Sequence, residues 1–137
     1  MDSYLKHYIN GKWVDSIGGK RHEVISPSTE EPCTEITLGT QADVDAAVSA
    51  ARQAFKTFSQ TSREERIALM NRIIEEYKKR IPDFAKSMAA EMGAPVSFAT
   101  MAQAPAGLGG FLGTLPALEN FAFKEQHGAN TVVYEPI

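Results

Sequence analysis

The sequence has 137 residues, of which 43% are hydrophobic and 23% charged, and its net charge is −3. This one-domain length and ordinary composition exclude disordered and collagen-like chains, and the absence of a basic stripe argues against nucleic acid as a partner. No run reaches the roughly 18 apolar residues of a membrane span, and no signal peptide is recognisable. We therefore expect no membrane association and a cytoplasmic location.

The first part of the chain predicts short β-strands over residues 4–38. Asn10-Gly11 separates two β-prone runs, and this dipeptide readily supplies the positive φ angles of a type I′ hairpin. Further strands are expected at residues 22–25, which end before a proline, and at 33–38, where polar and apolar residues alternate.

The pattern then changes to that of α-helices. Thr40 can cap a helix with Asp43 in its first turn, and apolar residues at steps of three and four predict that this helix covers 41–58. Ser62 and Glu65 match the capping box of the next helix.

Residues 62–92 form the longest amphipathic stretch. Pro82 would clash with the preceding turn inside a helix but suits a first helical position. We therefore predict two helices, at 62–80 and 82–92, or one helix kinked sharply at the proline. One face carries the apolar side chains of Ile67, Met70, Ile74, Tyr77, Ile81, Phe84 and Met88.

The last third of the chain is mostly small and apolar. A further helix is expected over 96–123, although its glycines and prolines weaken the signal. The run from Gly107 to Gly113 does not fit a dinucleotide-binding loop, because its third glycine falls one residue late and no strand precedes it. We interpret Gly109 and Gly113 as positions where two helices approach closely. Residues 129–135 are rich in β-prone side chains.

The residues reveal no catalytic set. His7, His22 and His127 have no second ligand at metal-binding spacing, so we predict no zinc site. Cys33 is the only cysteine and has acidic neighbours, which disfavour a thiolate, so a structural role is the better interpretation. We predict no catalytic and no cofactor-binding residues in this chain.

Several short motifs follow one another along nearly the whole sequence. They are Tyr8-Ile9-Asn10-Gly11-Lys12-Trp13-Val14, Ser26-Pro27-Ser28-Thr29, Gly39-Thr40 with Asp43-Val44-Asp45, Ala50-Ala51-Arg52-Gln53-Ala54-Phe55, Arg63 to Ile73, Glu91-Met92-Gly93-Ala94-Pro95 and Glu135-Pro136-Ile137. In this order and spacing they resemble the amino-terminal part of an NAD(P)-dependent aldehyde dehydrogenase. Ala94 departs from the family pattern, in which a lysine is common.

The resemblance implies an α/β chain that forms part of a larger enzyme. Residues 1–127 would be the amino-terminal part of the cofactor-binding domain, and 128–137 would begin a β-extension that joins subunits into a homo-oligomer. The complete protein would be roughly three to four times as long and would oxidise an aldehyde to a carboxylic acid with NAD or NADP. Its nucleophilic cysteine and its glutamate base have no counterpart here.

The resemblance also implies a place for the long amphipathic helix. Its apolar face would pack on the parallel sheet of the cofactor domain, whose strands follow Ile137. Without that sheet, we expect the chain to associate and to expose Ile67, Met70, Ile74 and Tyr77.

Two points remain open. Some relatives hold a monovalent cation through backbone oxygens at positions matching Val24 and Ile25 and an acidic side chain matching Glu91, although Glu91 also suits a solvated helix end. The strand over 129–135 is interpreted as an interface strand, with an edge strand covered within the chain as the alternative. The alternative function is a stand-alone assembly or regulatory module that binds a full-length relative through this last strand. An unrelated helical binding protein ranks last.

Overall fold

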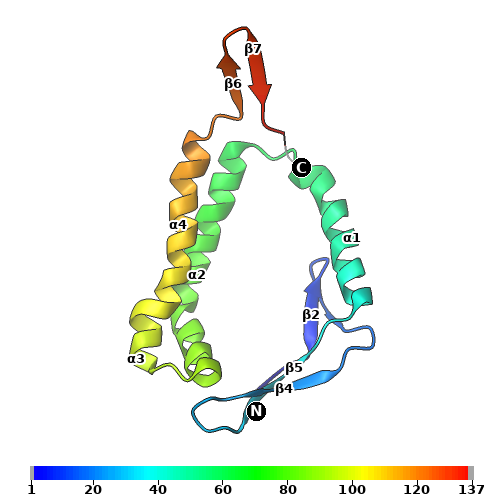
Figure 1. The fold of residues 1–137 in the computed structure, drawn as a ribbon, viewed down its shortest axis with the longest axis vertical. Helices are drawn as coiled ribbons and strands as arrows, with labels where there is room; N and C mark the ends of the chain where they lie inside the picture. Colours follow the sequence, from blue (N-terminus) through cyan, green and yellow to red (C-terminus); the bar gives the residue numbers. More distant parts are fainter. Residues whose placement is uncertain (1, 136–137) are drawn as a thin grey trace.

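A computed structural model describes residues 2–135. A pair of long helices lies opposite a single helix, small β-sheets connect the two at one end, and a β-hairpin projects at the other (Figure 1). The elements are β1 Asp2–Tyr4, β2 Lys6–Ile9, β3 Lys12–Asp15, β4 Arg21–Ile25, β5 Pro32–Thr37, α1 Gln41–Phe58, α2 Arg63–Met92, α3 Val96–Phe98, the π-helical turn η1 Ala99–Gln103, α4 Ala104–Asn120, β6 Lys124–His127 and β7 Asn130–Val133.

The predicted amino-terminal hairpin is present as β2 and β3. Asn10 and Gly11 have φ angles of 53° and 75°, as a type I′ turn requires, so the prediction from this dipeptide is confirmed. Tyr8 lies opposite Trp13 in the register, and their rings pack edge to face at 5.2 Å between centroids. The other predicted strands, β4 and β5, form a separate sheet with β1, which the sequence did not predict; the order is β1-β5-β4, and β5 runs parallel to β1 and antiparallel to β4.

Helix α1 begins after the predicted N-cap Thr40, which forms a full capping box with Asp43. Thr40 Oγ1 accepts a hydrogen bond from the Asp43 backbone N–H, and the Asp43 carboxylate accepts one from the Thr40 N–H at 2.8 Å. Asp43 is only 5% exposed, and its carboxylate also accepts hydrogen bonds from the Ser16 hydroxyl and from the Ile17 N–H at 2.9 Å. These donors, Ser16 first, hold the pKa of Asp43 far below its usual value. Asp43 therefore fastens the turn after β3 to the start of α1.

Helix α2 is one continuous helix, so the division into helices at 62–80 and 82–92 is wrong. Pro82 lies inside it, and the αL residue Gly93 caps its carboxyl end with φ of 68°. The helix continues because packing outweighs the lost hydrogen bond: residues on both sides of the proline, Ile81 and Met88, pack on one buried alanine cluster. The cluster consists of Ala85, Ala99 and Ala104.

The apolar face of α2 packs against α4, which runs back alongside it within this chain (Figure 1). Ile74 is only 3% exposed, and Tyr77 packs against Phe84 and Phe111 with centroids 4.7 and 5.9 Å apart. The expected exposure of the α2 face is therefore wrong. Helix α4, which was expected only as a further helix within 96–123, provides the surface on which this face of α2 packs. Of the four residues concerned, Ile74 is buried, and the other three, Ile67, Met70 and Tyr77, are half-buried.

Glycines matter in α4 at a position other than the predicted ones. A Cβ atom at Gly109 or Gly113 would meet no heavy atom within 4 Å, so these residues do not serve a close helix approach. At Gly107 a Cβ would lie 2.2 Å from the Tyr77 hydroxyl oxygen. The close approach of α2 and α4 therefore occurs at Gly107.

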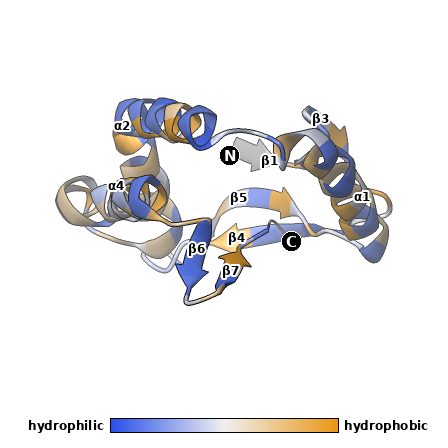
Figure 2. Cartoon of the chain, turned by 90° about the horizontal axis from the view of Figure 1, so that it is seen from above, coloured by the Kyte–Doolittle hydropathy of each residue, from blue (hydrophilic) through white to orange (hydrophobic). Residues whose placement is uncertain are grey.

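The chain segment after α4 forms a second hairpin. Strand β7 was expected, but its partner β6 was not, because β6 is the polar sequence Lys-Glu-Gln-His. Gly128 takes the positive φ of 63° in the turn between them. Figure 2 shows hydrophilic β6 beside a more hydrophobic β7. One edge of β7 is thus covered within the chain, as the alternative interpretation of this strand expected.

Candidate functional site

Glu91, the acidic residue of the predicted cation site, lines a small polar cavity of about 230 Å³ where the end of α2 meets β5. A Cβ at Gly93 would lie 2.8 Å from Ser28 Oγ and 3.0 Å from Pro27 Cγ, so the end of α2 also touches the loop after β4. The lining residues are Tyr4, Cys33, Thr34, Asp83, Lys86, Ser87, Ala90 and Glu91.

Val24 and Ile25 lie on β4, one strand away from this cavity. Val24 pairs with Thr34 and Ile25 with Pro32, with a register shift between them. Pro32 has no amide hydrogen, so it cannot donate a hydrogen bond to the Ile25 carbonyl. Thr34, the strand partner of Val24, lines the same cavity as Glu91, whereas Val24 and Ile25 themselves do not line it. The carbonyl oxygens of Val24 and Ile25 and the carboxylate oxygens of Glu91 are the ligand type that hard cations prefer.

Cys33 lies half-buried in β5, and its Sγ donates a hydrogen bond to the Val24 carbonyl oxygen at 3.3 Å. This bond ties β5 to β4 and uses the thiol proton. The contact supports the interpretation of Cys33 as a structural residue.

The histidines lie in three separate elements. His7 is half-buried on β2, and its Nε2 has no hydrogen-bond partner, whereas His22 is exposed on β4. His127 on β6 contacts the Glu125 carboxylate at 2.8 Å. Within residues 2–135, no group of three or more His, Cys, Asp or Glu side chains could hold a metal ion.

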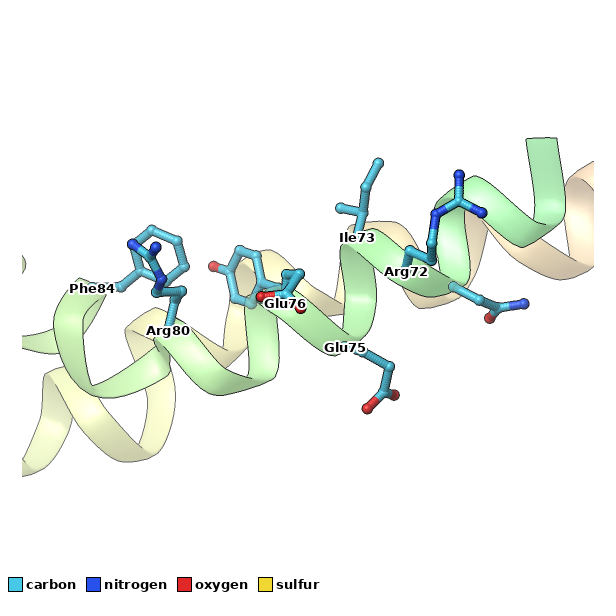
Figure 3. Close-up of a pocket in the computed structure, with 8 residues that line it drawn as sticks. Arg72, Ile73, Glu75, Glu76, Arg80 and Phe84 are labelled. Carbon is cyan, nitrogen blue, oxygen red and sulfur yellow. The ribbon is translucent and has the colours of Figure 1, made fainter. Parts of the chain in front are cut away.

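An open groove of about 820 Å³ lies along one face of α2. Figure 3 shows its lining side chains along a single helix, with Glu75 pointing away from Ile73. The lining combines apolar and aromatic groups with charged ones and contains no thiol or imidazole, so it suits packing rather than covalent chemistry. The residues are Asn71, Arg72, Ile73, Glu75, Glu76, Tyr77, Arg80 and Phe84.

The fold and these surfaces define an α/β segment whose groove and exposed apolar side chains suit packing against further protein. A model of the aldehyde dehydrogenase family matches residues 13–136, and the chain belongs to this family. The predicted resemblance and the α/β class are therefore confirmed. Within the described part of the chain, no helix combines the length and apolarity needed to cross a membrane.

Individual relatives agree with this assignment. A protein described as a putative aldehyde dehydrogenase from Staphylococcus aureus (strain bovine RF122 / ET3-1) is 42% identical over 137 residues, which is all of this chain and 29% of that protein. An aldehyde dehydrogenase from Bartonella henselae has a TM-score of 0.90 at 40% identity, covering 95% of this chain and 28% of that structure.

A further structure was determined with ligands. Aldehyde dehydrogenase C from Pseudomonas syringae, as a mutant in complex with NAD+ and octanal, has a TM-score of 0.88 at 34% identity, covering 93% of this chain and 26% of its own. The chain therefore spans less than a third of the relatives that it matches, and it corresponds to their amino-terminal part.

Proposed function

We propose that this chain is the amino-terminal segment of an enzyme that oxidises an aldehyde to a carboxylic acid with NAD+ or NADP+. The similarity to the Pseudomonas syringae enzyme, which was solved with NAD+ and octanal, carries this proposal. Bound NAD(P)+ would supply the hydride acceptor. The chain itself would contribute scaffold, since its cysteine is engaged between strands and its histidines lie apart.

Two features of its surface support a division of the segment into two parts. We assign residues 1–127 to the cofactor-binding domain, because α1 presents apolar side chains that a larger domain would cover. We assign 128–137, which include β7, to the start of the oligomerisation extension, because the hairpin that β7 forms with β6 projects beyond the helices (Figure 1). The apolar side chains on α1 are Val44, Val48, Phe55 and Phe58, each at least 43% exposed.

A monovalent cation at the junction of α2 and β4 is part of the proposal. The carbonyl oxygens of Val24 and Ile25 and the carboxylate of Glu91 would hold it and tie the end of the helix to the sheet. Binding of K+ or Na+ should raise the thermal stability of the complete protein, and Glu91→Gln should remove this dependence. Equal stabilisation of the wild type and of Glu91→Gln by the cation would argue against the site.

The enzymatic proposal is tested by NADH or NADPH formation with octanal and an aromatic aldehyde. We expect turnover by the complete protein and none by residues 1–137. Turnover by this chain alone would show that it contains a catalytic set. A folded complete protein that is inactive on every aldehyde tested, with either cofactor, would refute the proposed activity.

The outer side of β7 favours a second candidate function. Within the described residues β7 pairs with β6 alone, and Val132 and Val133 are exposed, so the other edge of the strand is open for addition to another chain. A stand-alone module of this kind should form a stable complex with a full-length relative. Separate elution of the two proteins in size-exclusion chromatography would count against it.

A further inference from the structure

The base of the β6–β7 hairpin is tied to the helices by Arg63, the first residue of α2. Its Nη1 donates a hydrogen bond to the Glu119 carbonyl oxygen at 3.0 Å, and its Nη2 donates one to the Phe121 carbonyl oxygen. Its guanidinium also lies 5.3 Å from the centroid of the Phe123 ring. One side chain thus contacts the end of α4 and the link that leads into β6.

Three aromatic rings join the two strands at the same place. Phe121 packs edge to face on Phe123 at 4.9 Å and on Tyr134 at 5.4 Å between centroids. The Tyr134 N–H donates a hydrogen bond to the Phe123 carbonyl oxygen at 2.9 Å. The segments that enter and leave the hairpin are therefore held together at the point where Arg63 binds.

The hairpin needs such bracing because it has little packing of its own. All residues of β7 and all but Glu125 of β6 are exposed. Isolated two-stranded hairpins are marginally stable in water. The contacts at the base of the hairpin must therefore fix its direction and keep its two strands ordered.

We propose that Arg63 is a positioning residue, which fixes the direction of the β6–β7 hairpin relative to α2 and α4 and on which subunit assembly depends. The assembly part rests on the proposed role of residues 128–137 in joining copies of the protein. Arginine suits the position because its planar fork reaches two carbonyl groups at once and stacks on an aromatic ring. Its charge also lies at the carboxyl end of α4, where a cation is favourable.

Arg66 provides a matched control on the same helix. Its Nε donates to Thr61 Oγ1 at 2.9 Å and its Nη2 to the Ser59 carbonyl oxygen at 3.2 Å, and its guanidinium lies 5.9 Å from the Phe58 ring centroid. It therefore makes the same kinds of contact at the end of α1. Replacing it removes equivalent chemistry without touching the hairpin.

The position of the hairpin is tested by hydrogen exchange of the complete protein, followed by mass spectrometry. In Arg63→Met, we expect the backbone amides of residues 124–133 to exchange about tenfold faster, as the loss of charge-assisted hydrogen bonds predicts. Arg63→Lys should lie between this variant and the wild type, because lysine keeps the charge without the fork. Arg66→Met should leave the hairpin unchanged. Wild-type exchange of the hairpin in Arg63→Met would overturn the inference.

Sedimentation velocity tests the consequence for assembly. Val132→Pro disrupts β7 directly and should dissociate the oligomer, and Arg63→Met should weaken it about tenfold while Arg66→Met does not. An intact oligomer in Val132→Pro would refute the proposed role of the hairpin in joining subunits. Dissociation of Val132→Pro beside an intact Arg63→Met oligomer would instead refute the dependence on Arg63.

Discussion

The contact between Gly107 and Tyr77 makes a sharp prediction about the helix pair. In Gly107→Ala, the new methyl group would lie 2.2 Å from the Tyr77 hydroxyl oxygen and 3.0 Å from its Cζ atom. Neither separation is compatible with van der Waals contact, so the tyrosine has to move. It is held by the rings of Phe84 and Phe111 and by its hydrogen bond to the Ala104 carbonyl oxygen at 2.8 Å.

The magnitude follows from three contributions. Loss of the hydrogen bond costs about 1 kcal/mol, and forcing a group into a packed contact costs about 1–3 kcal/mol. Alanine in place of a helical glycine returns about 1 kcal/mol. We therefore expect Gly107→Ala to destabilise the α2–α4 contact by about 1–3 kcal/mol. Gly109→Ala and Gly113→Ala should each stabilise helix α4 by about 0.5–1 kcal/mol, because no atom obstructs their Cβ positions.

Hydrogen exchange of α4 peptides measures this effect, because it reports local opening even in a chain that associates. Tyr77→Phe removes the hydroxyl oxygen, so the cost of Gly107→Ala should fall by about 1 kcal/mol in that background. The reasoning would be refuted if Gly107→Ala stabilised α4 as much as Gly109→Ala does. It would also be refuted if the effects of Gly107→Ala and Tyr77→Phe on the stability of α4 were additive.

Three other predictions concern separate elements. The pKa of the Asp43 carboxyl is lower in the folded chain than its unfolded value of about 3.9, so its stabilisation is present above that value and is lost as the pH falls toward the folded pKa. Asp43→Asn should thus lower the unfolding temperature at neutral pH and flatten its fall in acid, and an unchanged pH profile would contradict this. Pro82→Ala should stabilise α2 by up to about 3 kcal/mol in urea unfolding, and an unchanged unfolding midpoint would contradict this. Residues 1–137 alone should associate, and light scattering that shows a monomer at all concentrations would disprove this.

Local chemistry made part of the fold predictable. Asn10-Gly11 specifies its turn through backbone sterics, and the capping pairs specify their helix starts through hydrogen bonds spanning three residues. These signals act within a few residues, and the structure confirms each of them. The short range of local signals also explains the error at Pro82. Proline favours a helix break locally, but packing on residues that come later in the chain outweighs this preference.

The functional features depend on contacts between residues that are far apart in the sequence, so the sequence alone predicts them less well. Arg63 appears in the sequence as one of many charges on an amphipathic helix, and its carbonyl partners lie 56 and 58 residues further on. Val24 and Ile25 entered as cation ligands only through the family resemblance, since backbone ligands place no demand on side-chain identity. Strand β6 was missed because its polar side chains carry no β signal.

The two sides of the molecule differ in how completely the chain itself closes them. On the α2–α4 side, Ile74 is 3% exposed and the aromatic contacts of Tyr77 lie within the helix pair. On the other side, Val44 of α1 is 52% exposed, although it belongs to an apolar face with the same helical spacing. The long helix that organises the sequence therefore has its partner in this chain. The surface that remains to be covered lies mainly on α1 and along the outer groove of α2.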